Sequence, residues 1–411
     1  MNVLSGLIGI AVIFGIGFLM SSNRKAIKPR TILLGLLLQI TFAYLAIKNE
    51  YGVKVMGTLS DFVNGLIGYA NEGIMFLFGG LYDKAANGSA DSGIFFVFAF
   101  QVLPLVIFFG ALIAALYHLG IMQFIIRVLG GAISKLLGTS KPESLSAAAN
   151  IFVGQSEAPL VVKPFLPKMT KSELFAVVTG GLASVSGSVL AGIAGMGVDL
   201  KFLLAACFMS MPSGLIMAKL FMPETDNSER TFTIDVKKNQ GESVNLIEAI
   251  SVGAIDGMKL AATIGAMLLA MTSLIAMLNG GLGAVGGWFG FSITLEQIFG
   301  YIFAPLALAI GVPWSEAVQA GTFIGQKIVL NEFVAYSNFA PVMGTLSEKT
   351  QVIITFALCG FANFSSIAIC VGGIGSLVPE RRAEIASIGL RAMFAGVLAS
   401  LLSATIAGMF V

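Results

Sequence analysis

The sequence predicts an all-α polytopic membrane protein with eight transmembrane helices, two oppositely oriented re-entrant helical hairpins and interfacial helices, arranged as an inverted repeat. Three observations support this prediction. Of the 411 residues, 56% are hydrophobic and only 11% are charged, which is far too apolar for a soluble protein of this length. Apolar runs near the length of a bilayer recur along the chain. Two further apolar stretches are broken by glycine, proline and polar residues, so they fit neither a spanning helix nor a loop.

The apolar runs define the spanning segments. The first ends in a basic cluster without a small-residue cleavage site, which favours a retained helix over a removed signal peptide. Between the second and third runs, Asp61 and Glu72 lie among apolar residues, which suggests amphipathic helices at the membrane surface. The predicted spans are residues 3–20, 31–48, 94–117, 172–195, 202–222, 256–278, 350–375 and 385–410.

The cations are distributed unevenly, although the net charge is only +2. Counted alternately from an outside N-terminus, the inner segments hold most of the lysine and arginine, beginning with the cluster Arg24 to Arg30 and including the hydrophilic loop Pro223 to Asn245. This asymmetry follows the positive-inside rule. It predicts a multi-pass protein with its N-terminus outside, the lipid bilayer as its partner and no binding of nucleic acid.

The two broken stretches predict the hairpins. Ser144 to Pro167 is interrupted at Gly154 and Pro159, and its flanking lysines, Lys141 and Lys168, require the same side of the membrane. Such a segment is tolerated at membrane depth only where its tip is buried in protein or lines a cavity. The stretch from Trp314 to Pro341 predicts a second hairpin that enters from the outer side.

The two halves of the chain resemble each other. Ile121–Leu137, the first hairpin and Ser172–Gly195 have counterparts in Leu295–Gly311, the second hairpin and Gln351–Ile374. Because the copies enter from opposite sides, the sequence predicts an inverted repeat, in which secondary transporters bind substrate and ion near the midplane. The expected division is residues 1–118 as scaffold helices, 119–222 as the first transport repeat, 223–293 as a cytoplasmic loop with a scaffold helix, and 294–411 as the second transport repeat.

Two glutamates at membrane depth mark the candidate site. Glu157 follows Gln155 in the first hairpin, and Glu332 follows Asn331 in the second. A carboxylate costs about 2.5–3.5 kcal/mol at the centre of a spanning helix, so one that is retained usually faces a cavity, an ion or a ligand. Lys327 is close enough in sequence to pair with Glu332, which offers a purely structural explanation for that glutamate.

Three sequence motifs together resemble those of a known protein family. The run from Ala147 to Pro159 (AAANIFVGQSEAP), then NEFVAY from Asn331, then CGFANFSS from Cys359, resembles the concentrative nucleoside transporter family, and most of all its bacterial sodium-coupled members. The resemblance implies a homotrimer in the bacterial cytoplasmic (inner) membrane. It implies a secondary active symporter that imports uridine, other pyrimidine nucleosides and adenosine by alternating access, coupled to inward sodium flow.

The same resemblance assigns roles to individual residues. Gln155, Ser156 and Glu157 would contact the nucleobase, with Val189 and Phe361 as apolar walls. Glu332, Asn363 and Ser366 would hold the ribose. One sodium ion would be bound by the side chains of Asn150 and Ser184 and by the backbone carbonyls of Val153 and Val185, and no other cofactor is implied.

Other interpretations remain open at this point. Proton coupling through Glu157 or Glu332 competes with sodium coupling, because a buried carboxylate can carry a proton. A membrane-embedded enzyme could use the two glutamates as acid and base, although no nucleophile and histidine pair lies near these motifs. A passive channel would show no accumulation. The three cysteines, Cys207, Cys359 and Cys370, lack metal-ligand spacing and are expected to be small core residues.

Overall fold

The protein is described by a computed structural model that covers residues 2–79, 81–82, 97–155, 157–226, 243–288 and 293–411. Within these ranges the regular structure is entirely helical. The hydrophilic loop predicted inside falls largely outside the described residues, and so does Ser156. The N-terminal part comprises α1 (Asn2–Leu19), α2 (Pro29–Ala43) with a π-helical extension η2 (Tyr44–Lys48), α3 (Glu50–Phe78), α5 (Phe98–Gln101) and α6 (Leu103–His118).

The same order of elements occurs twice in the rest of the chain. Each copy has one helix, an interrupted pair of helices, a broken helix and a long helix. The first copy is α7 (Ile121–Leu137), α8 (Lys141–Ala149) with α9 (Ala158–Val161) and η3 (Lys163–Lys168), α10 (Lys171–Ala183) with α11 (Gly187–Gly195), and α12 (Leu200–Phe221). The second is α14 (Leu295–Ala309), α15 (Ala317–Val329) with α16 (Glu332–Phe339), α17 (Glu348–Leu358) with α18 (Phe364–Leu377), and α19 (Arg382–Ala407). Short 3-10 turns η5 (Trp314–Glu316), η6 (Ala340–Thr345) and η7 (Pro379–Arg381) complete it.

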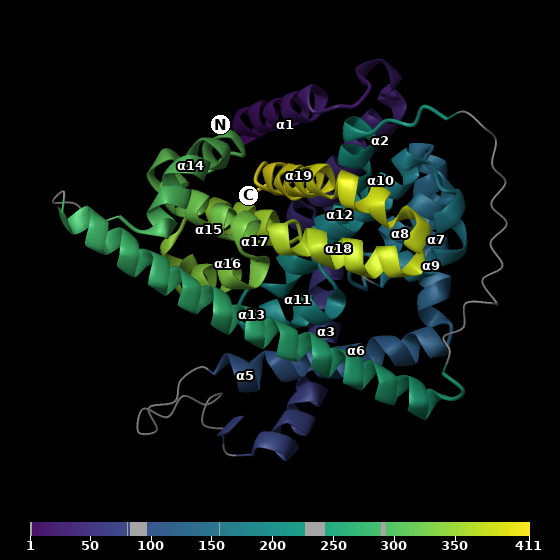
Figure 1. Ribbon diagram of the computed structural model, residues 1–411, viewed down its shortest axis with the longest axis horizontal. Coiled ribbons are helices and arrows are strands. Elements are labelled where there is room, and N and C mark those ends of the chain that lie inside the picture. Colours follow the sequence, from purple (N-terminus) through teal and green to yellow (C-terminus); the bar gives the residue numbers. More distant parts are fainter. Residues whose placement is uncertain (1, 80, 83–96, 156, 227–242, 289–292) are drawn as a thin grey trace.

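The packing of the two copies is repeated as well. The α10 helix packs against α12 of its own copy and against α19 of the other, and α17 packs against α19 of its own copy and against α12 of the other. In both copies the leading helix lies on the first arm of the interrupted pair, α7 on α8 and α14 on α15. Buried residues of α10, α12, α17 and α19 form much of the main apolar core, and Figure 1 shows α19 beside α10 and α17.

Local sequence explains where several of these helices begin. Thr170 accepts a hydrogen bond from the backbone N–H of Glu173, while the Glu173 carboxylate accepts one from the N–H of Thr170. Thr294 and Gln297 form the same reciprocal cap at the start of α14. Each capping box satisfies backbone donors that the first helical turn leaves unpaired. α10 and α14 therefore start at fixed points that are set by their own residues.

Within the described part of the chain, six helical segments are long and apolar enough to cross a membrane: Pro29–Lys48, Phe98–His118, Lys171–Gly195, Leu200–Phe221, Leu246–Trp288 and Pro379–Ala407. Val3–Leu19 and Phe364–Leu377 are shorter apolar helices at two more of the predicted spans. The predicted spans 172–195 and 350–375 are each interrupted, the first between Ala183 and Gly187 and the second between Leu358 and Phe364. The segment predicted to hold amphipathic surface helices is one helix, α3, over most of its described length.

The α13 helix (Leu246–Trp288) crosses one side of the molecule as its longest helix (Figure 1). The glycine-rich run from Gly280 to Gly290 reads as a linker in the sequence, but this prediction is wrong as far as Trp288, because the helix continues through these glycines. α13 packs along α6, where a Cβ on Gly253 would lie 2.7 Å from the carbonyl oxygen of Gly110. Small residues let membrane helices approach closely in this way.

Candidate functional site

The predicted site residues meet where the two interrupted pairs and the two broken helices converge. After α8 ends, the chain turns back at Gly154, whose carbonyl accepts from the N–H groups of Glu157 and Ala158. The tip is attached to the first broken helix because the N–H of Gly187 donates to the carbonyl of Phe152 (3.0 Å). Gly181 keeps this approach open, since a Cβ there would lie 2.9 Å from the Cβ of Gln155.

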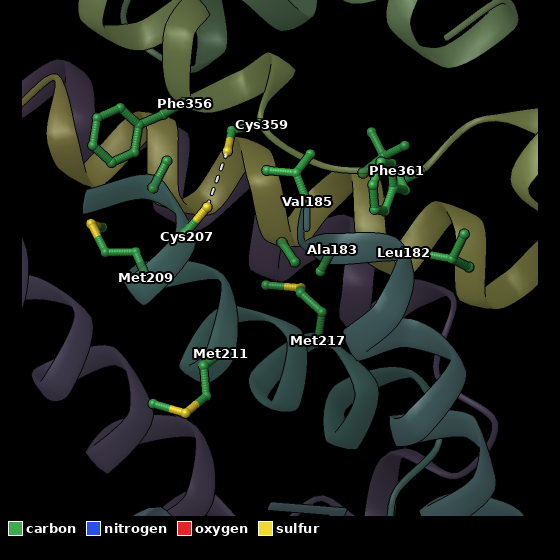
Figure 2. Packing of buried hydrophobic residues seen from close by; sticks show 14 of the residues in the cluster. Leu182, Ala183, Val185, Cys207, Met209, Met211, Met217, Phe356, Cys359 and Phe361 are labelled. Carbon is green, nitrogen blue, oxygen red and sulfur yellow. Dashed lines mark hydrogen bonds between the residues drawn. The ribbon is translucent and has the colours of Figure 1, made fainter. Parts of the chain in front are cut away.

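A backbone hydrogen bond also joins the two helix breaks. The N–H of Phe361, in the break between α17 and α18, donates to the carbonyl of Ser184, in the break between α10 and α11 (3.1 Å). Gly360 allows this contact, because a Cβ there would lie 3.1 Å from the carbonyl oxygen of Ala183. Figure 2 shows Val185 and Phe361 beside this crossing, with the thiols of Cys207 and Cys359 pointing toward each other at 4.0 Å.

These elements enclose a cavity of about 260 Å³. All seven described residues among the eight predicted for the substrate line it: Gln155, Glu157, Val189, Glu332, Phe361, Asn363 and Ser366. Glu332 is 4% exposed and Asn363 is 1% exposed, whereas Glu157 is exposed. The cavity therefore has a buried polar end, formed by Glu332 and Asn363 of the second copy. Its other polar side, formed by Glu157 of the first copy, is more accessible.

The polar side chains that line the cavity form hydrogen bonds with one another. Asn363 donates through Nδ2 to Oε2 of Glu332 (3.1 Å), and its Oδ1 accepts from the N–H of Ser366 as the cap of α18 (2.9 Å). Gln155 donates through Nε2 to Oγ of Ser366 (3.3 Å), and its Oε1 accepts from the Cys370 thiol (3.3 Å). A buried polar network of this kind is costly when partly satisfied, so its members are fixed in position. It brings amide, hydroxyl and carboxylate groups together in the cavity, and these are groups that can bond a polar organic molecule.

The four residues predicted to bind the ion lie together behind the first hairpin tip. Asn150, Val153, Ser184 and Val185 are all buried. Asn150 donates through Nδ2 to the carbonyl of Ser146, and its Oδ1 has no hydrogen-bond partner among the described residues. α10 closes over this group, since a Cβ on Gly180 would lie 3.3 Å from Nδ2 of Asn150.

The chemistry of this donor set suits a hard monovalent cation. Its members offer amide, hydroxyl and backbone carbonyl oxygens at the end of one helix and in the break of another, which is where transporters coordinate sodium. Elsewhere in the described residues, no group of three or more His, Cys, Asp or Glu side chains could hold a metal ion. The free Oδ1 of Asn150 is the orphaned buried polar atom that a bound ion would satisfy.

The direct pairing of Lys327 with Glu332 suggested by the sequence is not observed. Lys327 is buried on α15, and its Nζ has no hydrogen-bond partner among the described residues. The three cysteines are buried and free, as expected for small core residues. His118 ends α6 and takes no part in the cavity.

The sequence did not predict that α13 lines the cavity. Asp256, Leu260, Thr263 and Met267 line one side of the cavity. Asp256 accepts from Nζ of Lys259 (2.9 Å), and both side chains of this pair are largely exposed. An aspartate within a largely apolar helix is the signal that could have found it. The hydrophobic members of this face give no such signal.

Comparison with known proteins identifies relatives over the full chain. Models of the Na+-dependent nucleoside transporter C-terminus and N-terminus match residues 202–408 and 8–81, and a nucleoside recognition model, named Gate, matches residues 99–200. The transporter YutK of Bacillus subtilis (strain 168) is 55% identical over 100% of both chains. Nucleoside permease NupC of Helicobacter pylori (strain ATCC 700392 / 26695) is 48% identical over 99% of this chain and 98% of its own.

Solved structures give the same result. CNTnw in an inward-facing substrate-bound state has a TM-score of 0.94 and 49% identity, covering 100% of this chain and 99% of its own. A doubly substituted form of CNTnw in an outward-facing state has a TM-score of 0.94 and 50% identity, covering 100% of this chain and 98% of its own. The fold is thus one that has been observed for CNTnw in both an inward-facing and an outward-facing state.

Proposed function

Because this chain belongs to the family of Na+-dependent nucleoside transporters, we propose that it imports uridine, other pyrimidine nucleosides and adenosine by symport with sodium. The family consists of transporters and not enzymes, and solved relatives adopt inward- and outward-facing states, as alternating access requires. The observation that carries the proposal is the cavity in which the Glu332–Asn363 pair faces Gln155 and Glu157 from the opposite hairpin.

The chemistry of the cavity matches the two parts of a nucleoside. Glu332 and Asn363 at the buried end suit the vicinal hydroxyls of ribose, because a carboxylate accepts from both and its charge-assisted bonds are about twice as strong as neutral ones. Gln155 and Glu157 suit the donors and acceptors on the edge of a base, and Val189 and Phe361 provide apolar walls for its faces. Ser156 belongs to the same proposed base contact but lies outside the described residues.

The substrate would replace bonds that already exist inside the cavity. Gln155 and Ser366 bond each other, so a nucleoside that enters exchanges with these partners and does not have to desolvate free polar groups. A site built to bond a hydroxyl rejects analogues that lack it, because its own groups are then left unpaired. Loss of ribose hydroxyls is therefore expected to cost more affinity than exchange of one pyrimidine for another.

Sodium is the proposed coupling ion, bound by Asn150, Val153, Ser184 and Val185. The family is named for its Na+ dependence, and the free Oδ1 of Asn150 supports this position. One sodium crossing 100 mV gains about 2.3 kcal/mol, and with a tenfold gradient the total supports accumulation of on the order of 500-fold. Proton coupling through Glu157 or Glu332 is the alternative that the experiment below distinguishes.

The ion and substrate sites share a structural element. Ser184 is a proposed sodium ligand through its side chain, and its carbonyl accepts from the N–H of Phe361, which lines the cavity. Gly187, at the start of α11, is bonded to Phe152 of the hairpin tip beside Val153. Ion binding would therefore order both helix breaks and the tip, and thus raise affinity for the nucleoside through contacts already present.

The same family assignment motivates the remaining proposals. The interrupted pairs α8–α9 and α15–α16 would be the two re-entrant hairpins, with residues 119–222 and 294–411 as the moving transport repeats and residues 1–118 and 223–293 as the scaffold. Large apolar side chains exposed on α3 and α13, such as Phe76 and Leu269, suit lipid or a neighbouring copy. We propose a homotrimer in the bacterial inner membrane with its N-terminus outside.

Uptake into proteoliposomes tests the function directly. Labelled uridine would be offered with an inward sodium gradient or an inward proton gradient at matched membrane potential, and the accumulated label would be checked for chemical identity. Accumulation of intact uridine with sodium supports the proposal. Accumulation with protons alone would assign coupling to the glutamates, and the absence of accumulation under both gradients would refute nucleoside symport.

A further inference from the structure

Lys327 is a buried cation that the proposed transport mechanism does not use. Its side chain is 1% exposed on α15, and its Nζ has no hydrogen-bond partner among the described residues. Burial of an ammonium group without a bonded partner is unfavourable, and such groups are usually paired or neutralised. A lysine held there at this cost requires an electrostatic reason.

The surroundings of Lys327 identify the charge that it acts on. Lys327 lies on α15, which packs directly against α16, and the buried Glu332 at the start of α16 is the carboxylate whose charge acts on it. The hydroxyl of Tyr336, on α16, is engaged as a donor to the carbonyl of Thr355 (2.7 Å). Glu332 is therefore the carboxylate in the field of Lys327.

The other carboxylates that line the cavity have different surroundings. Glu157, from the first hairpin, accepts a bond within its own tip and is influenced by Asp256, not by Lys327. Asp256, from α13, is paired with Lys259 at 2.9 Å. Lys327 thus serves Glu332 alone among the described carboxylates of the cavity.

The lysine acts without forming a direct bond. Asn363 donates to Oε2 of Glu332 and is the one side-chain hydrogen-bond partner of that carboxylate among the described residues. An ammonium bonded to Glu332 would occupy the oxygens that face the cavity. Placed at a distance, it offsets the charge of Glu332 and leaves these oxygens available to a ligand.

The repeated architecture gives this position a counterpart. In the first copy, the proposed sodium lies between the end of α8 and the break after α10. In the second copy, Lys327 on α15 lies near Cys359, at the break after α17. The second copy thus carries a tethered positive charge where the first is proposed to bind a mobile ion.

We propose that Lys327 is a positioning residue for ribose recognition: it is the counter-ion that keeps Glu332 ionised and free to accept from the ribose hydroxyls. This role rests on the proposed nucleoside function. It predicts that removal of the lysine charge weakens the interaction with the ribose and leaves the interaction with the base in place.

Calorimetric binding to purified protein tests the role with uridine and 3′-deoxyuridine. The proteins would be the wild type, Lys327→Gln, Lys327→Arg, Glu332→Gln and the double variant Lys327→Gln, Glu332→Gln. In Lys327→Gln, affinity for uridine should fall at least about tenfold, because a charge-assisted bond to the carboxylate is weakened. Affinity for 3′-deoxyuridine should fall less, so the discrimination between the two ligands shrinks.

The variants separate this role from a purely structural one. Lys327→Arg should keep the discrimination between the two ligands, since it keeps the charge. Lys327→Gln should have no further effect in the Glu332→Gln background, because its effect passes through the carboxylate. Unchanged discrimination in Lys327→Gln, or losses that simply multiply in the double variant, would overturn the proposal.

Failure to fold is also informative. If Lys327→Gln does not fold but the double variant does, the lysine is needed to offset Glu332, as proposed. If neither folds, the lysine has a structural role independent of Glu332 and the proposal is wrong. A folded wild-type protein that binds no uridine would instead refute the proposed function, and this role with it.

Discussion

Asn363 offers the sharpest test of the site, because one side chain performs two separable tasks. Its Oδ1 caps α18 by accepting from the N–H of Ser366, and its Nδ2 donates to Oε2 of Glu332 at 3.1 Å. Serine, aspartate and asparagine are about equally good N-cap residues. Asn363→Ser and Asn363→Asp therefore both retain the cap and differ only in what they present to Glu332.

The structure gives the size of the expected effect. Asn363→Ser removes a hydrogen bond to a charged group, which is worth about 1.5–3 kcal/mol, so affinity for uridine should fall about 10- to 150-fold. Asn363→Asp places a second carboxylate about 3 Å from the first, and two unit charges at that distance repel by about 5 kcal/mol at an effective dielectric constant of 20. Its affinity should fall further than that of the serine variant.

Equilibrium binding of uridine and 3′-deoxyuridine measures both effects, and thermal melting in detergent checks the cap. Uridine affinity should follow the order wild type, serine variant, aspartate variant, while both variants retain the folded helix. Equal affinity of all three proteins for uridine would refute the role of the Glu332–Asn363 pair in binding. If the melting temperatures of both variants fell well below that of the wild type, the loss of affinity would be attributed to the lost cap of α18 and not to the ribose contact.

Three further predictions concern the proposed ion site, the hydrogen-bonded contact between the two helix breaks, and the ion pair that joins α8 to α12. Asn150→Ala removes the free Oδ1, so the sodium concentration for half-maximal uridine uptake should rise at least about tenfold, and an unchanged sodium dependence would exclude this ligand. Gly360→Ala introduces a Cβ 2.6 Å from a hydroxyl oxygen of α19 and should lower stability by about 1–3 kcal/mol in thermal melts; Gly372→Ala, where the Cβ meets no atom within 4 Å, is the matched control and should melt near the wild-type temperature. Lys219→Met breaks the buried ion pair with Glu143 (2.6 Å) and should cost about 3–5 kcal/mol, most of it restored when Glu143→Gln is added; a double variant as unstable as the single one would contradict this reasoning.

The sequence locates the polar part of the site because polar groups are conspicuous at membrane depth. Glu332 and Asn363 stand out within apolar stretches, and the structure brings them to 3.1 Å. The interruptions at Ser184 and Cys359 are less visible, because a polar or small residue in a spanning helix does not by itself end the helix. The N–H of Phe361 in one break donates to the carbonyl of Ser184 in the other, and this bond joins residues far apart in the chain.

The side of the cavity formed by α13 shows why the rest could not be predicted. A helix in a bilayer can be apolar on the face toward lipid and equally apolar on the face toward a ligand. Its hydropathy therefore does not show which face lines a cavity. Leu260 and Met267 line the cavity because residues of both copies face that side of α13 across it, and this arrangement is a tertiary property. Asp256 could have been noticed as an intramembrane carboxylate, but its partner Lys259 lies within the same turn and offers a local explanation. The chain thus indicates which polar residues line the cavity, whereas the apolar surface beside them is determined by the assembly of the helices.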